Sequence, residues 1–176
     1  MKDNKMVVTL KAITTEQQAE VLQLAQASAD FFAEFGGGPV TAANVGEFFT
    51  KLPAGKENTD KHTFFIMADD EPVGFIDLIS GYPRPHTWYI GLFFITPEER
   101  GAGIGRQAFA MLSNFARKQG ANKLRLAAAK ENENGLKFWQ KNAFVITQYL
   151  EDFKIDGVAV PTYVLEKEVW VDVFVG

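Results

Sequence analysis

The feature that most constrains the fold is a glycine-rich turn between an apolar run and an amphipathic stretch. The turn reads Gly101-Ala102-Gly103-Ile104-Gly105-Arg106; it follows the apolar run 90–95 and precedes a stretch of helical spacing that ends near Gln119. This order predicts a strand, a tight turn and a helix. Glycine lets backbone N–H groups approach a ligand closely, and a helix N-terminus adds about half a positive charge. The turn therefore predicts a binding site for phosphate or pyrophosphate.

The spacing of the glycines argues against two common nucleotide motifs. The dinucleotide fingerprint G-x-G-x-x-G, started at Gly101, requires glycine at the position of Arg106, and the phosphate-loop pattern G-x-x-x-x-G-K is absent. Instead, Arg100 is followed by Gly103 at the third position and Gly105 at the fifth. This spacing resembles the acetyl-CoA-binding motif of the GNAT acetyltransferase superfamily.

A second motif lies downstream and resembles the other signature of the same family. It runs from Asn132 through Phe138-Trp139 to Phe144, with Gly135 where the family usually has alanine and Ala143 where it usually has glycine. Together the two motifs cover residues 87–147. Two ordered motifs at family spacing are far more specific than one glycine turn, so they favour membership of this superfamily.

The resemblance implies an α/β (α+β) fold: a mixed, mostly antiparallel sheet with central splayed parallel strands and flanking helices. The strands 87–96 and 123–129 would run parallel and separate, so that the pantetheine arm of acetyl-CoA enters between them. The backbone groups of Phe93, Phe94 and Ile95 would bind the pantetheine amides, and the Ile95 N–H would act as the oxyanion donor to the thioester carbonyl. The residues assigned to acetyl-CoA by resemblance and position are Phe93, Phe94, Ile95, Arg100, Gly101, Ala102, Gly103, Ile104, Gly105, Arg106, Asn132 and Trp139.

Length and composition limit the remaining possibilities. A chain of 176 residues with 47% hydrophobic content can bury one sizeable core, so we expect a single N-acetyltransferase domain over residues 1–176. The absence of a long apolar run and of a signal-like N-terminus predicts a cytoplasmic protein without membrane segments. The chain has no cysteine, which excludes an acyl-cysteine intermediate and favours direct transfer. No metal site is expected, because the two histidines lack zinc-ligand spacing.

The distribution of charge is more informative than the net charge of −4. Residues 1–86 carry −5, residues 87–147 carry +5 and residues 148–176 carry −4. The basic excess coincides with the two motifs and suits an anionic cofactor, whereas the acidic flanks suit a cationic amine and argue against nucleic acid. Arg106, Lys130 and Lys137 are the expected phosphate partners by position; the alternative is that each is simply a solvated surface charge.

The periodicity of the sequence predicts alternating strands and helices. Helices are expected over Thr15–Phe35, Thr41–Leu52, the stretch after the glycine turn up to Gly120, and 133–142 with Asn132 as its N-cap. Strands are expected over Met6–Ala12, His62–Ala68, Pro72–Ser80, Thr87–Thr96, Lys123–Ala129, Phe144–Phe153 and Pro161–Glu168. The second, third and fourth of these strands would form an antiparallel meander.

The reaction needs a base more than it needs an acid. Deprotonating an alkylamine of pKa about 10.4 at pH 7 costs about 4.6 kcal/mol, whereas keeping a thiol of pKa about 8.5 ionised costs about 2 kcal/mol. Asp77, in the apolar run Gly74–Ile79, is the candidate base, because burial would raise its pKa toward a useful range. The alternative is a structural carboxylate satisfied by a backbone donor.

Trp139 stands where many relatives have a tyrosine that acts as general acid. An indole N–H donates a hydrogen bond but does not transfer its proton, so we expect Trp139 to pack beside the pantetheine end of the cofactor. Tyr82, Trp88 and Tyr89 are candidates for an acceptor pocket, although aromatic residues in strands more often belong to a core.

Two classes of function remain open from the sequence. The first is an acetyl-CoA-dependent N-acetyltransferase that acts on a primary amine of a small molecule or peptide; the alternative is a non-catalytic acetyl-CoA-binding sensor or partner module. The tail 169–175 alternates apolar residues like a strand, which suggests pairing between the subunits of a homodimer.

Overall fold

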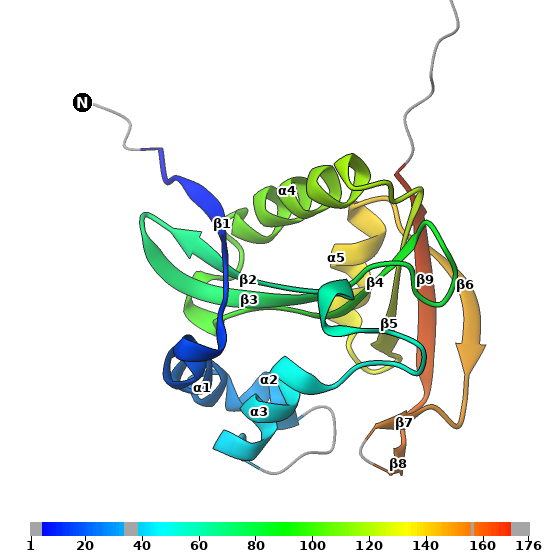
Figure 1. Cartoon of the computed structure of the whole chain (residues 1–176), viewed down its shortest axis with the longest axis horizontal. Coiled ribbons are helices and arrows are strands. Elements are labelled where there is room, and N and C mark those ends of the chain that lie inside the picture. Colours follow the sequence, from blue (N-terminus) through cyan, green and yellow to red (C-terminus); the bar gives the residue numbers. More distant parts are fainter. Residues whose placement is uncertain (1–4, 34–38, 156, 170–176) are drawn as a thin grey trace, which may run out of the picture.

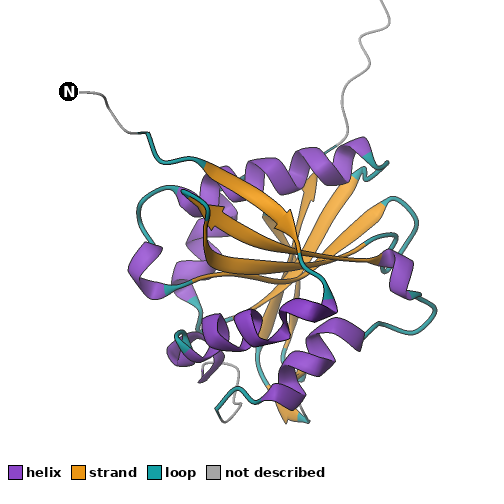
Figure 2. Cartoon of the chain, turned by 60° about the vertical axis from the view of Figure 1, so that its left-hand side comes forward, coloured by secondary structure: helices purple, strands orange, loops and turns teal. Residues whose placement is uncertain are grey.

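The strands form one central sheet with helices on both faces (Figures 1 and 2). In this computed structural model, residues 5–33, 39–155 and 157–169 are described. The seven-stranded sheet has the order β1-β2-β3-β4-β5-β9-β6. Its neighbours are antiparallel except for β4 and β5, which are parallel. The predicted mixed sheet with a parallel centre is confirmed.

The elements agree in order and type with most of the sequence expectations. The strands are β1 (Val8–Ala12), β2 (Lys61–Ala68), β3 (Glu71–Ile79), β4 (Thr87–Ile95), β5 (Lys123–Ala129), β6 (Val145–Leu150), β7 (Lys154–Ile155), β8 (Val158–Ala159) and β9 (Thr162–Glu168). The α-helices are α1 (Gln18–Gln26), α2 (Ala29–Ala33), α3 (Ala42–Thr50), α4 (Ile104–Lys118) and α5 (Glu133–Lys141). Short 3₁₀ turns are η1 (Thr15–Gln17), η2 (Asn58–Asp60) and η3 (Pro97–Glu99).

Two apolar clusters lie on opposite faces of the sheet. On one face, α4 and α5 pack through residues such as Ile104, Leu112 and Trp139. On the other face, α1 and α3 pack through Val21 and Val45 against rings of the sheet. Figure 1 shows α4 above the sheet and α1, α2 and α3 below it. The sheet is therefore the middle layer of a three-layer arrangement.

The antiparallel meander β2–β3–β4 is confirmed, and it contains two irregularities. Between β2 and β3 the register shifts at Ile66 and Met67, so that Val73 is an extra residue on β3. Between β3 and β4 the register shifts after Asp77, so that Gly91 is an extra residue on β4. Each bulge changes which residues share a face of the sheet.

The helix expected over Thr15–Phe35 is not continuous, and this expectation was wrong. A 3₁₀ turn precedes α1, and the chain breaks between α1 and α2, where the Ser28 carbonyl accepts hydrogen bonds from the N–H groups of Phe31 and Phe32. The restart places both phenylalanine rings 5.5 Å from the ring of Phe94. Contact with the sheet thus overrides the helical periodicity of the sequence.

The C-terminal part follows the expected closing pair with shorter strands. Strand β9 pairs with β5 on one side and β6 on the other. The strand expected to reach Phe153 ends at Leu150, and a small β7–β8 pair follows it. Val169 is buried, and its N–H donates to the Asn122 carbonyl. Residues 170–175 of the tail expected to form a strand lie outside the described residues. In the described part of the chain, no helix is long and apolar enough to cross a membrane.

Gly74 is required by the close approach of β3 and β4. A Cβ atom there would overlap the Phe94 carbonyl oxygen, whereas a Cβ at Gly46, inside α3, would meet nothing within 4 Å. We expect Gly74→Ala to lower the free energy of unfolding by about 1–3 kcal/mol through overpacking. We expect Gly46→Ala to raise it by about 0.5–1 kcal/mol, because alanine restricts the unfolded chain more. Thermal and denaturant unfolding of both variants measure this; equal effects would contradict the close contact.

Candidate active site

The sheet opens in its middle, between the two parallel strands. The pairing of β4 with β5 runs from Thr87–Lys123 to Ile90–Leu126 and stops there. The next residue of β4, Gly91, is exposed although its strand is central in the sheet. A central strand with an exposed residue and an unpaired edge is a place where a ligand can enter. The predicted splaying of the two parallel strands is confirmed.

The direction of each backbone N–H and C=O bond decides whether that group of β4 faces β3 or the opening. The Thr96 N–H donates to the Val73 carbonyl of the β3 side. Because these directions alternate along a strand, the backbone groups of Phe94 also face β3, whereas those of Phe93 and Ile95 face the edge toward β5. The Ile95 carbonyl follows this rule, since it accepts a hydrogen bond of 2.8 Å from Arg100 Nε. The Phe93 and Ile95 N–H groups therefore point to the open side.

The glycine turn has the geometry of an anion site. Gly101 and Gly103 have φ values of +83° and +82°, and a Cβ at either would meet nothing within 4 Å. Gly103 is the N-cap of α4 and provides no side-chain cap, so the first N–H groups of a 15-residue helix are left for a ligand. Ala102 lies exposed between the two glycines, and Ile104 is buried under the helix.

Gly105 has a different role from its neighbours in the turn. A Cβ there would lie 3.1 Å from a ring carbon of Phe138 and 3.3 Å from Cδ1 of Ile95. It therefore lets the first turn of α4 pack closely against α5 and β4. Gly105 is therefore needed for the packing of α4 against α5 and β4. Its position in the motif does not reveal this role.

The two arginines of the motif lie differently. Arg100 Nε holds the Ile95 carbonyl, and its guanidinium lies 3.5 Å from Asp30 Oδ2 of α2. Arg106 is exposed and lines a groove of about 360 Å³ beside α4, together with Arg117, Asn142 and Lys167. Arg100 thus fixes the turn to β4, while Arg106 keeps its charge at the surface.

The second motif forms the start and the end of α5. Asn132 is the N-cap, and its Oδ1 accepts a hydrogen bond of 2.9 Å from the Gly135 N–H, as expected from the sequence. A Cβ at Gly135 would collide with the Asn132 amide, which explains the glycine where alanine is usual. After the helix, Ala143 adopts φ +67°, the left-handed region that favours glycine. Both departures from the family motif are therefore local to the helix ends.

Trp139 is buried in an aromatic cluster between α5, α4 and β4. It is 8% exposed, and its ring lies 5.3 Å from Phe93, 5.7 Å from Phe109 and 5.1 Å from Phe144, centre to centre. Phe93 is one of the two residues whose backbone faces the opening, so the indole supports the wall of the opening from behind.

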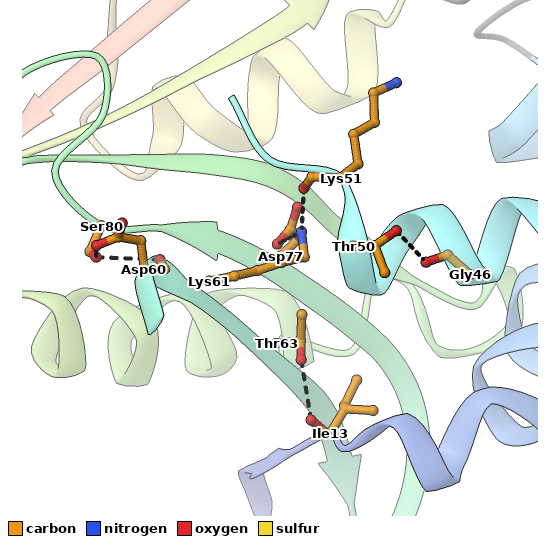
Figure 3. A network of polar contacts seen from close by, with 9 residues as sticks. All are labelled: Ile13, Gly46, Thr50, Lys51, Asp60, Lys61, Thr63, Asp77 and Ser80. Atoms are coloured by element: carbon orange, nitrogen blue, oxygen red, sulfur yellow. Dashed lines mark hydrogen bonds and ion pairs between the residues drawn. The ribbon is translucent and has the colours of Figure 1, made fainter. Parts of the chain in front are cut away.

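Asp77 lies next to the opening, on the face that carries α1, α2 and α3. It pairs with Leu92 across the Gly91 bulge, and its Oδ1 lies 2.8 Å from Lys61 Nζ (Figure 3). Burial raises the pKa of the Asp77 carboxyl, and the Lys61 ammonium counteracts part of this rise. The carboxylate is therefore partly buried, paired on one oxygen, and adjacent to an exposed part of β4.

Sequence analysis missed Lys61, because the predicted strand began at His62. The sequence did contain a signal for the pair: Lys61 and Asp77 carry opposite charges on the two strands of a predicted hairpin. The register of that hairpin, which decides whether the two side chains meet, could not be known from the sequence. Of the aromatic candidates for the acceptor side, Trp88 stacks on His62 at 5.1 Å within the α4 face, whereas Tyr89 shares the face of Asp77 and lies 5.6 Å from Tyr82.

Comparison with known families identifies the class of this protein. The model of the acetyltransferase (GNAT) family matches residues 19–144. The chain belongs to this family, and it is an N-acetyltransferase. No curated protein sequence matches it.

Solved structures with the same fold include acetyltransferases that act on different acceptors. An acetyltransferase from Thermus thermophilus has 24% identity and a TM-score of 0.69, covering 90% of this chain and 96% of that one. Spermidine N-acetyltransferase from Vibrio cholerae, solved with CoA and spermine, has 18% identity and a TM-score of 0.73, covering 92% and 95%. Ribosomal-protein-S18-alanine N-acetyltransferase from Escherichia coli has 11% identity and a TM-score of 0.70, covering 94% and 96%. At these sequence identities, the similarity to the solved structures establishes the fold of this chain. It does not identify the acceptor substrate.

The aromatic cluster predicts different outcomes for two substitutions of Trp139. Phenylalanine fills much of the volume, so Trp139→Phe should keep kcat/KM within about tenfold of the parent. Trp139→Ala leaves a cavity and should lower the free energy of unfolding by about 3–5 kcal/mol, with a larger loss of activity. Steady-state kinetics and thermal unfolding measure both. Loss of turnover in Trp139→Phe with an unchanged Tm would instead indicate a specific indole N–H contact.

Proposed function

We propose that this protein is an acetyl-CoA-dependent N-acetyltransferase that transfers the acetyl group directly to a primary amine of a small molecule or peptide, and that residues 1–176 act as one catalytic domain. The observation that carries the proposal is the opening between β4 and β5, with an uncapped helix N-terminus on one side and the Asp77 carboxylate on the other. The two reactants would then meet at the Gly91 bulge.

The residues around the opening fit acetyl-CoA. The turn Gly101–Gly105 and the first N–H groups of α4 would hold the pyrophosphate, with Arg106 contributing charge. The Phe93 and Ile95 backbone groups would bind the amides of the pantetheine arm. Phe94 would contribute only its ring to the wall, because its backbone faces β3. A solved structure of similar fold, the V. cholerae spermidine N-acetyltransferase, holds CoA.

Each of the residues at the opening has a different role in the proposed acetyl transfer. Acetyl-CoA supplies the acetyl group as a thioester, whose C–S bond breaks as the C–N bond to the amine forms. Asp77 accepts the proton that the amine gives up. The Ile95 N–H donates to the carbonyl oxygen as negative charge grows on it. Trp139 supplies no proton, and water can protonate the departing thiolate, because a thiol pKa of about 8.5 makes that step undemanding.

A thiol-release assay with a panel of amines tests the proposal. An N-acetyltransferase releases CoA thiol from acetyl-CoA at a rate that depends on the amine added. A non-catalytic sensor, the alternative kept from the sequence, would bind acetyl-CoA in calorimetry and show no amine-dependent release. The panel should contain monoamines, diamines, polyamines and a peptide N-terminus, because the solved structures of this fold include enzymes for spermidine and for a protein alanine.

The glycine turn predicts a specific loss of cofactor affinity. Valine at Gly103 would place a β-branched side chain where the anion meets the backbone, at a φ that valine rarely adopts. We expect Gly103→Val to weaken acetyl-CoA binding at least ~100-fold. Gly120→Val is the matched control, because Gly120 has φ +98° beyond the other end of α4 and equally open space. It should lower stability and keep acetyl-CoA affinity in calorimetry; equal losses of affinity would remove the turn from the cofactor site.

The proposed base predicts a pH dependence. The carboxylate accepts a proton only when ionised, so kcat/KM should rise with pH through the pKa of Asp77, which burial holds above the usual aspartate value. We expect Asp77→Asn to lower kcat/KM about 10²–10⁴-fold and to remove this ascending limb, with acetyl-CoA affinity unchanged. Asp60→Asn is the control, since this carboxylate pairs with Lys56 and not with Lys61. Full activity in Asp77→Asn would show that another group is the base.

A further inference from the structure

Lys61 is a buried lysine that contacts Asp77, the carboxylate next to the opening. Its side chain is 5% exposed, and its Nζ donates to Asp77 Oδ1 at 2.8 Å and to the Lys51 carbonyl at 3.3 Å (Figure 3). The same ammonium lies 5.6 Å from the centre of the Phe48 ring of α3. The lysine therefore joins β2, β3 and the C-terminal end of α3 at a single point.

The two oxygens of Asp77 are not equivalent. Lys61 contacts Oδ1, whereas Oδ2 lies against Gly91, where a Cβ would approach it to 2.9 Å. Gly91 is exposed and directly follows the last β4–β5 pair. The oxygen that Lys61 does not hold is thus the one next to the opening. A side chain at position 91 would displace the carboxylate from this place.

A contribution to the stability of the fold is a weak explanation for the presence of the Lys61–Asp77 ion pair. Removing a lysine and a carboxylate from water is costly, and well-packed apolar residues often replace such pairs without loss. Because this pair stands at the opening, orientation of the carboxylate is the better explanation. The ammonium also affects what can bind, since like charges repel strongly where water is partly excluded.

The other charged side chains described here on this face have ion-pair partners of their own or are exposed. Glu166 of β9 contacts both Lys123 and Arg125 of β5. Tyr89 of β4 shares the face of Asp77, and burial raises its pKa, so it is uncharged at neutral pH. On α3, Glu47 is exposed, and the Lys51 side chain points away from Asp77. Among the described residues, Lys61 is the charged group in contact with Asp77, and its ammonium counteracts part of the rise that burial causes in the pKa of this carboxyl.

We propose that Lys61 is a positioning and specificity residue of the acceptor site: it turns one Asp77 oxygen toward the Gly91 bulge and occupies the place beside this carboxylate that a second ammonium group would need. The acceptor class is accordingly a monoamine and not a diamine or polyamine. This inference rests on the proposed function, and it distinguishes this chain from the spermidine N-acetyltransferase of similar fold.

The first test measures the carboxylate itself and needs no acceptor. The pKa of the Asp77 carboxyl is followed by NMR of protein labelled with ¹³C-aspartate, with Asp77→Asn to assign the signal. Lys61→Met removes the charge at similar length, and we expect the pKa of Asp77 to rise by at least about one unit, with Lys61→Arg close to the parent. Lys56→Met is the matched control, because it removes another lysine–aspartate pair from the neighbouring segment. An unchanged pKa in Lys61→Met overturns the positioning role.

The second test measures acceptor choice. For the best monoamine of the thiol-release panel and the diamine of the same carbon skeleton, the ratio of kcat/KM values should favour the monoamine. Lys61→Met should lower this ratio at least tenfold and move the ascending limb of the pH profile to higher pH, while Lys61→Arg and Lys56→Met keep both. A ratio unaffected by Lys61→Met, or a panel in which only diamines and polyamines react, overturns the specificity role.

The proposed function and the role of Lys61 can fail separately. If no amine is acetylated, or if Asp77→Asn keeps full kcat/KM, the proposed function or its base is wrong, and the NMR titration still decides whether Lys61 positions the carboxylate. If Asp77→Asn loses activity while Lys61→Met changes neither the Asp77 pKa nor the acceptor ratio, the proposed function stands and this inference is wrong.

Discussion

The parallel pairing of β4 and β5, and its end at Ile90 and Leu126, is the constraint on which the rest of this structure depends. A sheet normally satisfies every backbone group of a central strand, because unpaired buried N–H and C=O groups are costly. Among the described residues, no strand pairs with the edge of β4 that faces away from β3 beyond Ile90, so water or a ligand must satisfy its backbone groups. The aromatic cluster around Trp139 supports β4 from the α5 side and keeps this wall in place.

The sheet separates two chemical environments, and the opening lies between them. The α4 and α5 face carries the glycine turn and the uncapped helix N-terminus, which favour an anion. The face with α1, α2 and α3 carries the Lys61–Asp77 pair and a cluster of phenylalanine rings. In the proposed reaction, the cofactor and the amine approach from these two faces. A short bulge at Gly91 is then sufficient to bring the base and the thioester together.

Contacts in the fold also change the meaning of the charge distribution. Residues 87–147 carry a net charge of +5, yet Lys123 and Arg125 contact Glu166, and Arg100 binds the Ile95 carbonyl. Lys130 lies 5.6 Å from the centre of the Tyr149 ring. Part of the basic excess therefore belongs to the sheet itself, and a smaller part, including the exposed Arg106, remains for an anionic ligand. A charge count along the sequence overstates how much charge a ligand meets.

The sequence by itself determined the local features: the glycine turn before α4, the Asn132 cap, the end of α4 before Gly120, and the order of strands and helices around the two motifs. These depend on residues close in the chain, whose backbone preferences can be read directly. The sequence could not determine the break in the first helix or the partner of Asp77. If the register at the β2–β3 turn continued without the extra residue Val73, Asp77 would stand opposite His62, and Lys61 would point to the other face. Only the tertiary structure decided this, because side chains alternate along a strand and one inserted residue exchanges the faces, a choice made by the packing of the whole sheet.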